Sequence, residues 1–219
     1  MHRSPPPPFA DRAAAGRALA AALAGTAVDL VLGLPRGGVV IAAAVAEALG
    51  ADLDALLVRK IGAPGHAEWG IGALAEDDPP VFDADALDRL RLTPAALAPT
   101  VAAETAELHR RRLAYRGGRP APRLLDRRVL VVDDGLATGV TARAALALAR
   151  RRGAAWLGFA VPVSLAAGGG PAGDLVDGYR ALREAPELSA VSAAYRDFRA
   201  VTDAEVTALL RDRVPADGR

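Results

Sequence analysis

Short apolar runs alternate along the chain with longer segments in which apolar residues recur at helical spacing. The runs have the length of buried strands, and glycine, proline or charged residues bound them. The pattern predicts strands at residues 28–33, 53–58, 129–132, 155–161 and 179–182. It predicts helices at residues 10–23, 39–49, 93–115, 139–152 and 203–210, the third broken near Pro99 and the last capped by Thr202.

Strands that alternate with helices favour an α/β fold, a doubly wound and mostly parallel sheet of about five core strands with helices on both faces. Residues 61–83 are rich in glycine and proline, which predicts a mobile loop and a hairpin. We therefore expect an N-terminal arm and helix at 1–27, a core at 28–183 that includes a flexible lid at 59–83, and a small C-terminal hood and tail at 184–219. Residues 5–8 predict an extended arm and residues 166–173 a flexible bridge.

Composition excludes several classes of site. The 27 basic and 26 acidic residues leave a net charge of +1, so no overall field attracts nucleic acid or an anionic membrane. The chain has no cysteine, which excludes disulfides, thiolate zinc sites and thiol nucleophiles. Its 3 histidines argue against a histidine-rich metal site. No apolar run approaches the roughly 20 residues of a membrane span, and we expect no signal peptide because the first residues lack an apolar stretch. We expect a soluble, cytoplasmic protein without nucleic-acid or membrane partners.

The most informative stretch covers residues 129–141, which read VLVVDDGLATGVT. A buried strand leads into two carboxylates, Asp133 and Asp134, and then into a loop of small residues at the start of a helix. Free amides and the dipole at that helix start suit a phosphate group, and Thr138 and Thr141 add hydroxyl donors. The carboxylates suit the hydroxyls of a diol or a water-bridged Mg²⁺. A phosphate beside a diol describes a phosphorylated ribose.

Other interpretations of this stretch are weaker. A P-loop nucleotide hydrolase needs a lysine in or after the loop, and Lys60 is the only lysine of the chain. A phospho-acceptor receiver domain also needs a later lysine. A plain strand-to-helix turn with capping aspartates would not require this whole run of residues.

Two further segments point to anion binding. Pro35, Arg36, Gly37 and Gly38 follow the first strand, where the glycines expose amides at a helix start and Arg36 adds a fork of donors. The pair Arg59 and Lys60 follows the second predicted strand and precedes the glycine-rich loop. A compact ammonium group suits a multiply charged anion. Ligands of such sheets bind beyond the carboxyl ends of the strands, so we expect all three segments to meet there.

With these residues, the sequence resembles the type I phosphoribosyltransferases. The resemblance covers roughly residues 28–183, and it is strongest in the stretch 129–141. It implies that Asp133 and Asp134 bind the ribose hydroxyls and Mg²⁺, the latter mostly through water and substrate. It also implies that the 5′-phosphate is held by the loop Gly135, Ala137, Thr138, Gly139, Val140 and Thr141. Gly135 departs from the usual aliphatic residue after the acids.

The same resemblance implies an Mg²⁺-dependent enzyme that uses phosphoribosyl pyrophosphate (PRPP). Pyrophosphate would lie on Pro35, Arg36, Gly37, Gly38, Arg59 and Lys60, and Arg36, Lys60, Asp133 and Asp134 would carry catalysis. His66 and Glu68 in the lid are candidates for proton handling or for contacts to the waters of Mg²⁺. A narrower group of bacterial phosphoribosyltransferases shares GLPRGG, VRKIGAPG and DDGxATG with this chain.

The acceptor is a nitrogenous base that these motifs do not specify. The 6-oxopurine enzymes of the family carry an aspartate where Ala137 stands, which argues against hypoxanthine and guanine. Val163, Tyr195 and Phe198 are candidates to contact the base. One alternative function is a regulatory protein that binds PRPP or a nucleotide without turnover, and another is a hydrolase or phosphorylase at the same site. Relatives commonly dimerise, and the helix at 93–115 is a candidate interface.

Overall fold

The computed structural model describes residues 8–76, 78–166 and 174–211. Most of the predicted arm at 5–8 and of the predicted bridge at 166–173 therefore lies outside the described residues, as does the end of the predicted tail. Among the described residues, no helix has both the length and the apolar character to cross a bilayer.

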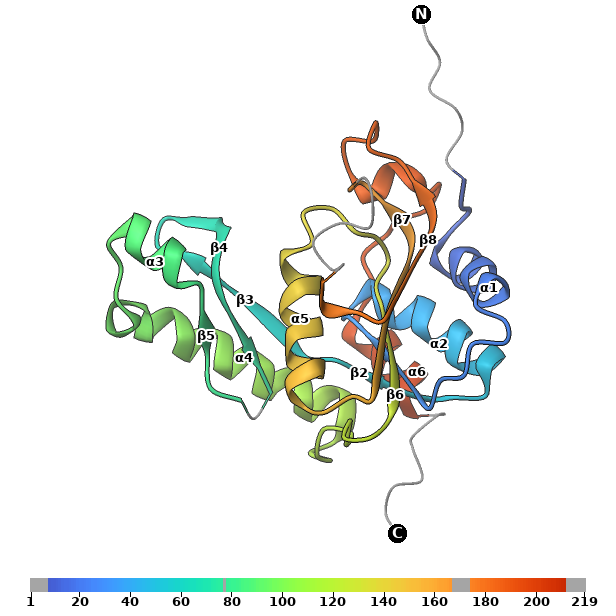
Figure 1. Ribbon diagram of the computed structural model, residues 1–219, viewed down its shortest axis with the longest axis horizontal. Coiled ribbons are helices and arrows are strands. Elements are labelled where there is room, and N and C mark those ends of the chain that lie inside the picture. Colours follow the sequence, from blue (N-terminus) through green and yellow to red (C-terminus); the bar gives the residue numbers. More distant parts are fainter. Residues whose placement is uncertain (1–7, 77, 167–173, 212–219) are drawn as a thin grey trace, which may run out of the picture.

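A parallel sheet of five strands forms the centre of the fold (Figure 1). Its order is β2, β1, β6, β7, β8. The strands span Leu30–Gly33 (β1), Asp52–Ala55 (β2), Arg128–Val132 (β6), Trp156–Ser164 (β7) and Gly178–Glu184 (β8). Their residues are Val- and Leu-rich and buried on both faces in the central strands, as expected for a parallel sheet between helices. The predicted doubly wound sheet is confirmed.

Helices cover both faces of the sheet, and the two faces form separate apolar clusters. On one face lie α1 (Arg12–Ala22), α2 (Gly37–Leu49) and α6 (Asp203–Arg211), which pack with Val31. On the other lies α5 (Val140–Arg151), which packs with Leu30 and Leu32. Neighbouring residues of β1 thus enter opposite clusters, because side chains alternate across a strand. Thr202 caps α6 as predicted, since its Oγ1 accepts a hydrogen bond from the Glu205 amide at 3.2 Å.

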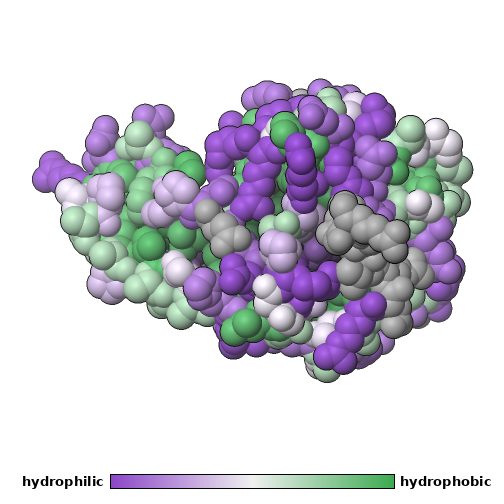
Figure 2. All heavy atoms as spheres, turned by 90° about the horizontal axis from the view of Figure 1, so that it is seen from below, coloured by the Kyte–Doolittle hydropathy of each residue, from purple (hydrophilic) through white to green (hydrophobic). Residues whose placement is uncertain are grey.

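A second, antiparallel sheet projects beside the core (Figure 1). It contains β3 (Val58–Ala63), β4 (His66–Ala75) and β5 (Val81–Phe82). After it come α3 (Ala84–Leu90), the short 3₁₀ helix η1 (Pro94–Leu97) and α4 (Ala98–Arg116). We call residues 58–76 and 78–116 the arm, which is a different part of the chain from the N-terminal arm predicted from the sequence. Seen from below, hydrophobic side chains gather on the arm, whereas hydrophilic ones dominate the surface of the core (Figure 2).

The secondary structure of the arm differs from the sequence prediction in two places. The predicted strand at 53–58 is two strands, because β2 ends at Ala55 and β3 begins at Val58. Leu56 still bonds to β1 through its amide, whereas the carbonyl of Leu57 accepts from Glu76 of the hairpin. The sequence of this segment, LDALLV, does not indicate the change of partner, because its last four residues are apolar across the boundary between the strands. In addition, α3 was not predicted, although Asp83 caps it by accepting the Ala86 amide at 2.9 Å.

A buried ionic cluster joins the arm to the core. The Arg116 guanidinium, at the end of α4, donates to Asp54 Oδ1 of β2 at 2.8 Å and to the Ala55 carbonyl at 2.5 Å. It also pairs with Glu76, which follows β4. Burial alone would lower the pKa of Arg116, but the charges of Asp54 and Glu76 outweigh burial and raise it. Three segments of the chain therefore depend on one guanidinium.

We expect Arg116→Met to lower the free energy of unfolding by about 3–5 kcal/mol, because it removes the guanidinium that bonds to two buried carboxylates. Urea denaturation near neutral pH would measure the loss. The matched control is Arg110→Met, also on α4, whose guanidinium is half exposed and pairs with Glu107 and Asp203. That control should unfold at nearly the same urea concentration as the wild type, because solvent screens exposed ion pairs and they contribute little to stability. Similar small losses in both variants would contradict a central role for the cluster.

Candidate functional site

Two loops meet at the carboxyl edge of the sheet because β1 and β6 are neighbours. Gly33 at the end of β1 pairs with Val132 at the end of β6. The loop after β1 leads into α2, and the loop after β6 leads into α5. The predicted pyrophosphate segment and the predicted ribose-phosphate segment therefore lie side by side.

The contact between these loops leaves no room for side chains at Gly37 and Gly38. A Cβ on Gly38 would lie 2.8 Å from the Val132 carbonyl oxygen and 2.9 Å from the Asp133 Cα. A Cβ on Gly37 would overlap Asp134 Oδ2. Glycine is required at both positions for close packing rather than for an unusual backbone angle. The peptide bond between Pro35 and Arg36 is cis.

The two acids are largely buried, and among the described residues one amide and one guanidinium donate to them. Asp133 Oδ1 accepts the backbone amide of Asp134 at 2.8 Å, and Asp134 Oδ2 accepts Nε of Arg12 at 2.7 Å. Burial raises the pKa of Asp133 well above its usual range, and the charge of Asp134 adds to the rise. Burial also raises the pKa of Asp134, and the hydrogen bond from Arg12 opposes it. Further donors or a cation would stabilise this pair in its charged form.

The loop after the acids forms a small cavity at the start of α5. Residues 135–142 and Asp133 line this cavity of about 150 Å³. Gly139 precedes α5 with a φ of 75°, a left-handed conformation that favours glycine. The Leu136 amide bonds to the Val163 carbonyl at 2.9 Å, which ties the loop to β7. Helix-start amides and threonine hydroxyls in one cavity suit a phosphate.

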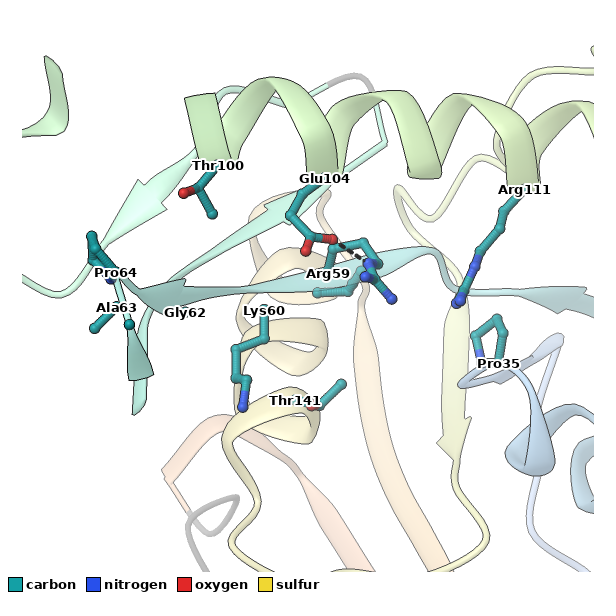
Figure 3. A pocket seen from close by; sticks show the side chains of 12 residues that line it. Pro35, Arg59, Lys60, Gly62, Ala63, Pro64, Thr100, Glu104, Arg111 and Thr141 are labelled. Atoms are coloured by element: carbon teal, nitrogen blue, oxygen red, sulfur yellow. Dashed lines mark hydrogen bonds and ion pairs between the residues drawn. The ribbon is translucent and has the colours of Figure 1, made fainter. Parts of the chain in front are cut away.

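A larger cavity of about 690 Å³ lies between the arm and the core (Figure 3). Its lining includes Pro35 from the loop after β1, Arg59 and Lys60 from β3, and Thr141 from α5. Figure 3 shows Lys60 extending from β3 toward the helix that carries Thr141. The three predicted segments are thus brought together at one cavity. Lys60 reaches the cavity from β3 of the arm, whereas the sequence predicted that it follows the end of a core strand.

Charged groups that the sequence did not single out also line the cavity. Glu104 on α4 accepts Nε of Arg59 at 2.5 Å. Arg111, about two turns further along α4, points toward Pro35 (Figure 3). Arg36 lies nearby as the residue before α2, with its Nη1 3.9 Å from Asp203 Oδ1. Three cations against one carboxylate in the lining favour an anionic ligand.

The predicted base-contact residues have other partners here. Val163 is fully buried in β7. The Tyr195 hydroxyl donates to the Asp134 carbonyl at 2.6 Å, and burial raises the pKa of Tyr195. Phe198 is half-buried and lies under the Arg12 guanidinium, which is 3.7 Å from its ring centroid. Contact with a base stays a prediction for all three.

The lid candidates lie on the hairpin. His66 stacks on Trp69 with ring centroids 4.3 Å apart. The side chain of Glu68 lies outside the described part of the chain. A role for either residue in proton transfer stays a prediction.

Sequence reasoning missed Arg12, Glu104 and Arg111 as residues of this region. Each is one charged residue on a helix in an arginine-rich chain, outside every motif. Only the packing of α1 and α4 brings them to the edge of the sheet, so no local pattern marks them.

Gly135, which departs from the family pattern, has a structural reason. A Cβ there would overlap Val191 Cγ1 and lie 2.7 Å from Cγ2. Val191 begins the short 3₁₀ helix η3 (Val191–Ala194) of the tail. The tail therefore packs directly on the loop after the acids, where an aliphatic residue would displace it.

We expect Gly135→Ala to lower the free energy of unfolding by about 1–3 kcal/mol, because the added methyl group overpacks against Val191. Val191→Ala removes both clashing atoms, so the double variant should recover much of the loss. A double-mutant cycle from urea denaturation would measure this coupling. Additive losses would show that Val191 does not determine the need for glycine.

Residues 10–180 match the phosphoribosyl transferase domain. The chain is 42% identical over 216 residues to proteins named “Putative phosphoribosyl transferase” in two strains of Mycobacterium tuberculosis. That alignment covers 95% of this chain and 47% of those proteins, so the chain spans about half the length of the curated relatives it matches.

The fold is also similar to the crystal structure of TT1426 from Thermus thermophilus. The TM-score is 0.80 at 40% sequence identity, covering 94% of this chain and 99% of that one. The expected family is confirmed by the domain match, which spans most of the sequence. The chain therefore belongs to the phosphoribosyl transferase domain family.

Proposed function

We propose that this protein transfers a 5-phosphoribosyl group from PRPP to a nitrogenous base and releases pyrophosphate. The observation that carries the proposal is the cavity of about 690 Å³ that Pro35, Lys60 and Thr141 line together. These residues belong to the three segments that a PRPP site needs. The acceptor class stays open, and Ala137 argues against 6-oxopurines.

The donor would lie along the carboxyl edge of the sheet. Its 5′-phosphate would accept hydrogen bonds from the loop 137–141, within the cavity at the start of α5. Its ribose hydroxyls would donate to Asp133 and Asp134, two largely buried carboxylates that accept hydrogen bonds from the Asp134 amide and from Arg12 respectively. Its pyrophosphate would lie on the amides of Gly37 and Gly38, with Arg36, Arg59 and Lys60 around it.

Asp133 and Asp134 fit an Mg²⁺ ion that is also held by water and substrate. No group of three or more histidine, cysteine or acidic side chains among the described residues forms a metal cage. Mg²⁺ is often bound through one or two carboxylates with water and substrate phosphates, which suits Asp133 and Asp134. When bound, Mg²⁺ would neutralise part of the pyrophosphate charge.

The chemistry requires little of the protein beyond position and charge. A base nitrogen forms a bond to C1′ of the ribose while the bond from C1′ to the pyrophosphate oxygen breaks, and the electron pair leaves with pyrophosphate. The proton that the base nitrogen loses passes to the released pyrophosphate or to solvent. Lys60 and Arg36 would stabilise the charge that grows on the leaving group. The hairpin of β3 and β4 would exclude water while C1′ is cationic.

We expect wild-type protein to bind PRPP in isothermal titration calorimetry more tightly with Mg²⁺ than without it. Asp134→Asn should weaken that binding by more than about tenfold, because it removes a charge-assisted contact worth about 1.5–3 kcal/mol. The control is Asp177→Asn, whose carboxylate accepts the Leu157 amide at the opposite edge of the sheet. It should bind PRPP like the wild type.

Two results would count against the proposal. If Asp134→Asn binds PRPP as tightly as the wild type, the diol is bound elsewhere. If the wild type binds no PRPP, the donor assignment itself is wrong.

We expect Lys60→Ala to lower turnover by about 10- to 100-fold, because one charged contact to the leaving group is lost. The measurement is pyrophosphate release with the nucleobase that is most active in a screen of the wild type. Arg17→Ala, on the exposed side of α1, is the control and should keep full turnover. Full turnover in Lys60→Ala would remove this lysine from the mechanism.

The same screen distinguishes the regulatory alternative. A wild-type protein that binds PRPP but releases no pyrophosphate with any base would be a sensor rather than a transferase.

A further inference from the structure

Arg12 contacts the candidate site although it lies in none of the three sequence motifs. It is the first residue of α1, and its side chain is 11% exposed. Its Nε donates to Asp134 Oδ2 at 2.7 Å, and its Nη1 donates to the Arg199 carbonyl at 2.8 Å. Its guanidinium also stacks on the Phe198 ring at 3.7 Å. One side chain from the beginning of the chain thus joins an acid of the site to the tail.

Two segments far apart in the sequence are paired next to the start of α1, where Arg12 lies. The Phe9 amide donates to the Ala194 carbonyl at 3.1 Å, and the Arg196 and Asp197 amides donate to the carbonyls of Phe9 and Ala10 at 2.9 Å each. We call residues 9–12 and 194–199 the end clamp. Tyr195 of the clamp donates to the Asp134 backbone at 2.6 Å. The clamp therefore holds Asp134 by both its side chain and its backbone.

These contacts fix which oxygen of Asp134 can meet a ligand. Oδ2 is engaged by Arg12 and lies against Gly37, where even a methyl group would overlap it. Oδ1 makes neither of these contacts, so it is the candidate oxygen for a ribose hydroxyl. The stacked ring and the Arg199 carbonyl hold the guanidinium independently of Asp134, so Arg12 does not need to leave when a ligand arrives. This arrangement favours a supporting role over a blocking one.

We propose that Arg12 is a positioning residue that turns Asp134 Oδ1 toward the ribose diol, so that the end clamp sets the affinity of the site for the sugar hydroxyls. The inference rests on the proposed function, because it takes a phosphorylated ribose as the ligand. It separates two parts of the site, since the phosphate loop 137–141 makes none of the contacts of Arg12 given above.

Two probes test this separation. Ribose 5-phosphate carries the ring, the phosphate and the hydroxyls, whereas tetrahydrofurfuryl phosphate carries the ring and the phosphate alone. Calorimetric or NMR titration gives the affinity of each. We expect Arg12→Gln to weaken ribose 5-phosphate binding by about tenfold or more, as for other charge-assisted contacts, and to change tetrahydrofurfuryl phosphate binding by less than about twofold.

Three further variants sharpen the comparison. Arg12→Lys keeps the charge but has no fork to bond Asp134 and Arg199 together, so its selective loss should be smaller than that of Arg12→Gln. Phe198→Leu removes the stacked ring and should give a small loss of the same selective kind. Arg17→Gln, on the exposed side of the same helix, should change neither affinity. Arg12→Lys also carries the test if Arg12→Gln does not fold.

The possible outcomes are distinct. Equal losses for both probes would show that Arg12 only stabilises the fold, and an unchanged or higher affinity for ribose 5-phosphate would show that it does not orient Asp134. Either result overturns the inference while PRPP binding by the wild type still supports the proposed function. A wild type that binds no PRPP, and that binds ribose 5-phosphate no more tightly than tetrahydrofurfuryl phosphate, would overturn both the inference and the proposed function.

Discussion

The close contact between the loops after β1 and β6 is the constraint on which the site depends. The strands are parallel neighbours, so their loops leave the sheet at the same edge and enter the same space. At Gly37 and Gly38 the backbone of one loop lies against the acids of the other. A single small ligand could therefore place an anionic group on the first loop and a diol on the second.

That closeness has an electrostatic cost. Asp133 and Asp134 are adjacent and largely buried, and burial disfavours the charged form of both. The charge of Asp134 adds to this effect at Asp133. A backbone amide and Arg12 offset part of this cost, and a ligand that donates hydrogen bonds would offset more. The end clamp is the means by which the fold provides Arg12, since the pairing of residues 9–10 with residues 194–197 fixes the start of α1. Residues 9–12 and 194–199 thus belong to the site rather than to its periphery.

The arm supplies the other half of the larger cavity. Side chains alternate along β3, so Arg59 turns to Glu104 of α4 whereas Lys60 extends toward Thr141 (Figure 3). At its base, Arg116 pairs with Asp54 of the core and Glu76 of the arm, which ties the hairpin to β2. The position of Lys60 relative to Pro35 therefore depends on a buried ionic cluster whose cation, Arg116, is far along the chain from either residue.

The amino-acid sequence by itself determined the α/β class, the core strands and helices, and the segments at the carboxyl edge. These follow from local signals: hydrophobic period, capping residues such as Thr202, and the run from Val129 to Thr141. Only the tertiary structure decided that β2 ends at Ala55, that Lys60 belongs to a projecting hairpin, and that Arg12 reaches Asp134. An apolar run does not show where a strand changes partner, and one arginine among many carries no mark of its contacts. Both depend on residues distant in sequence, because packing and charge pairing act through space and leave no local period in the chain.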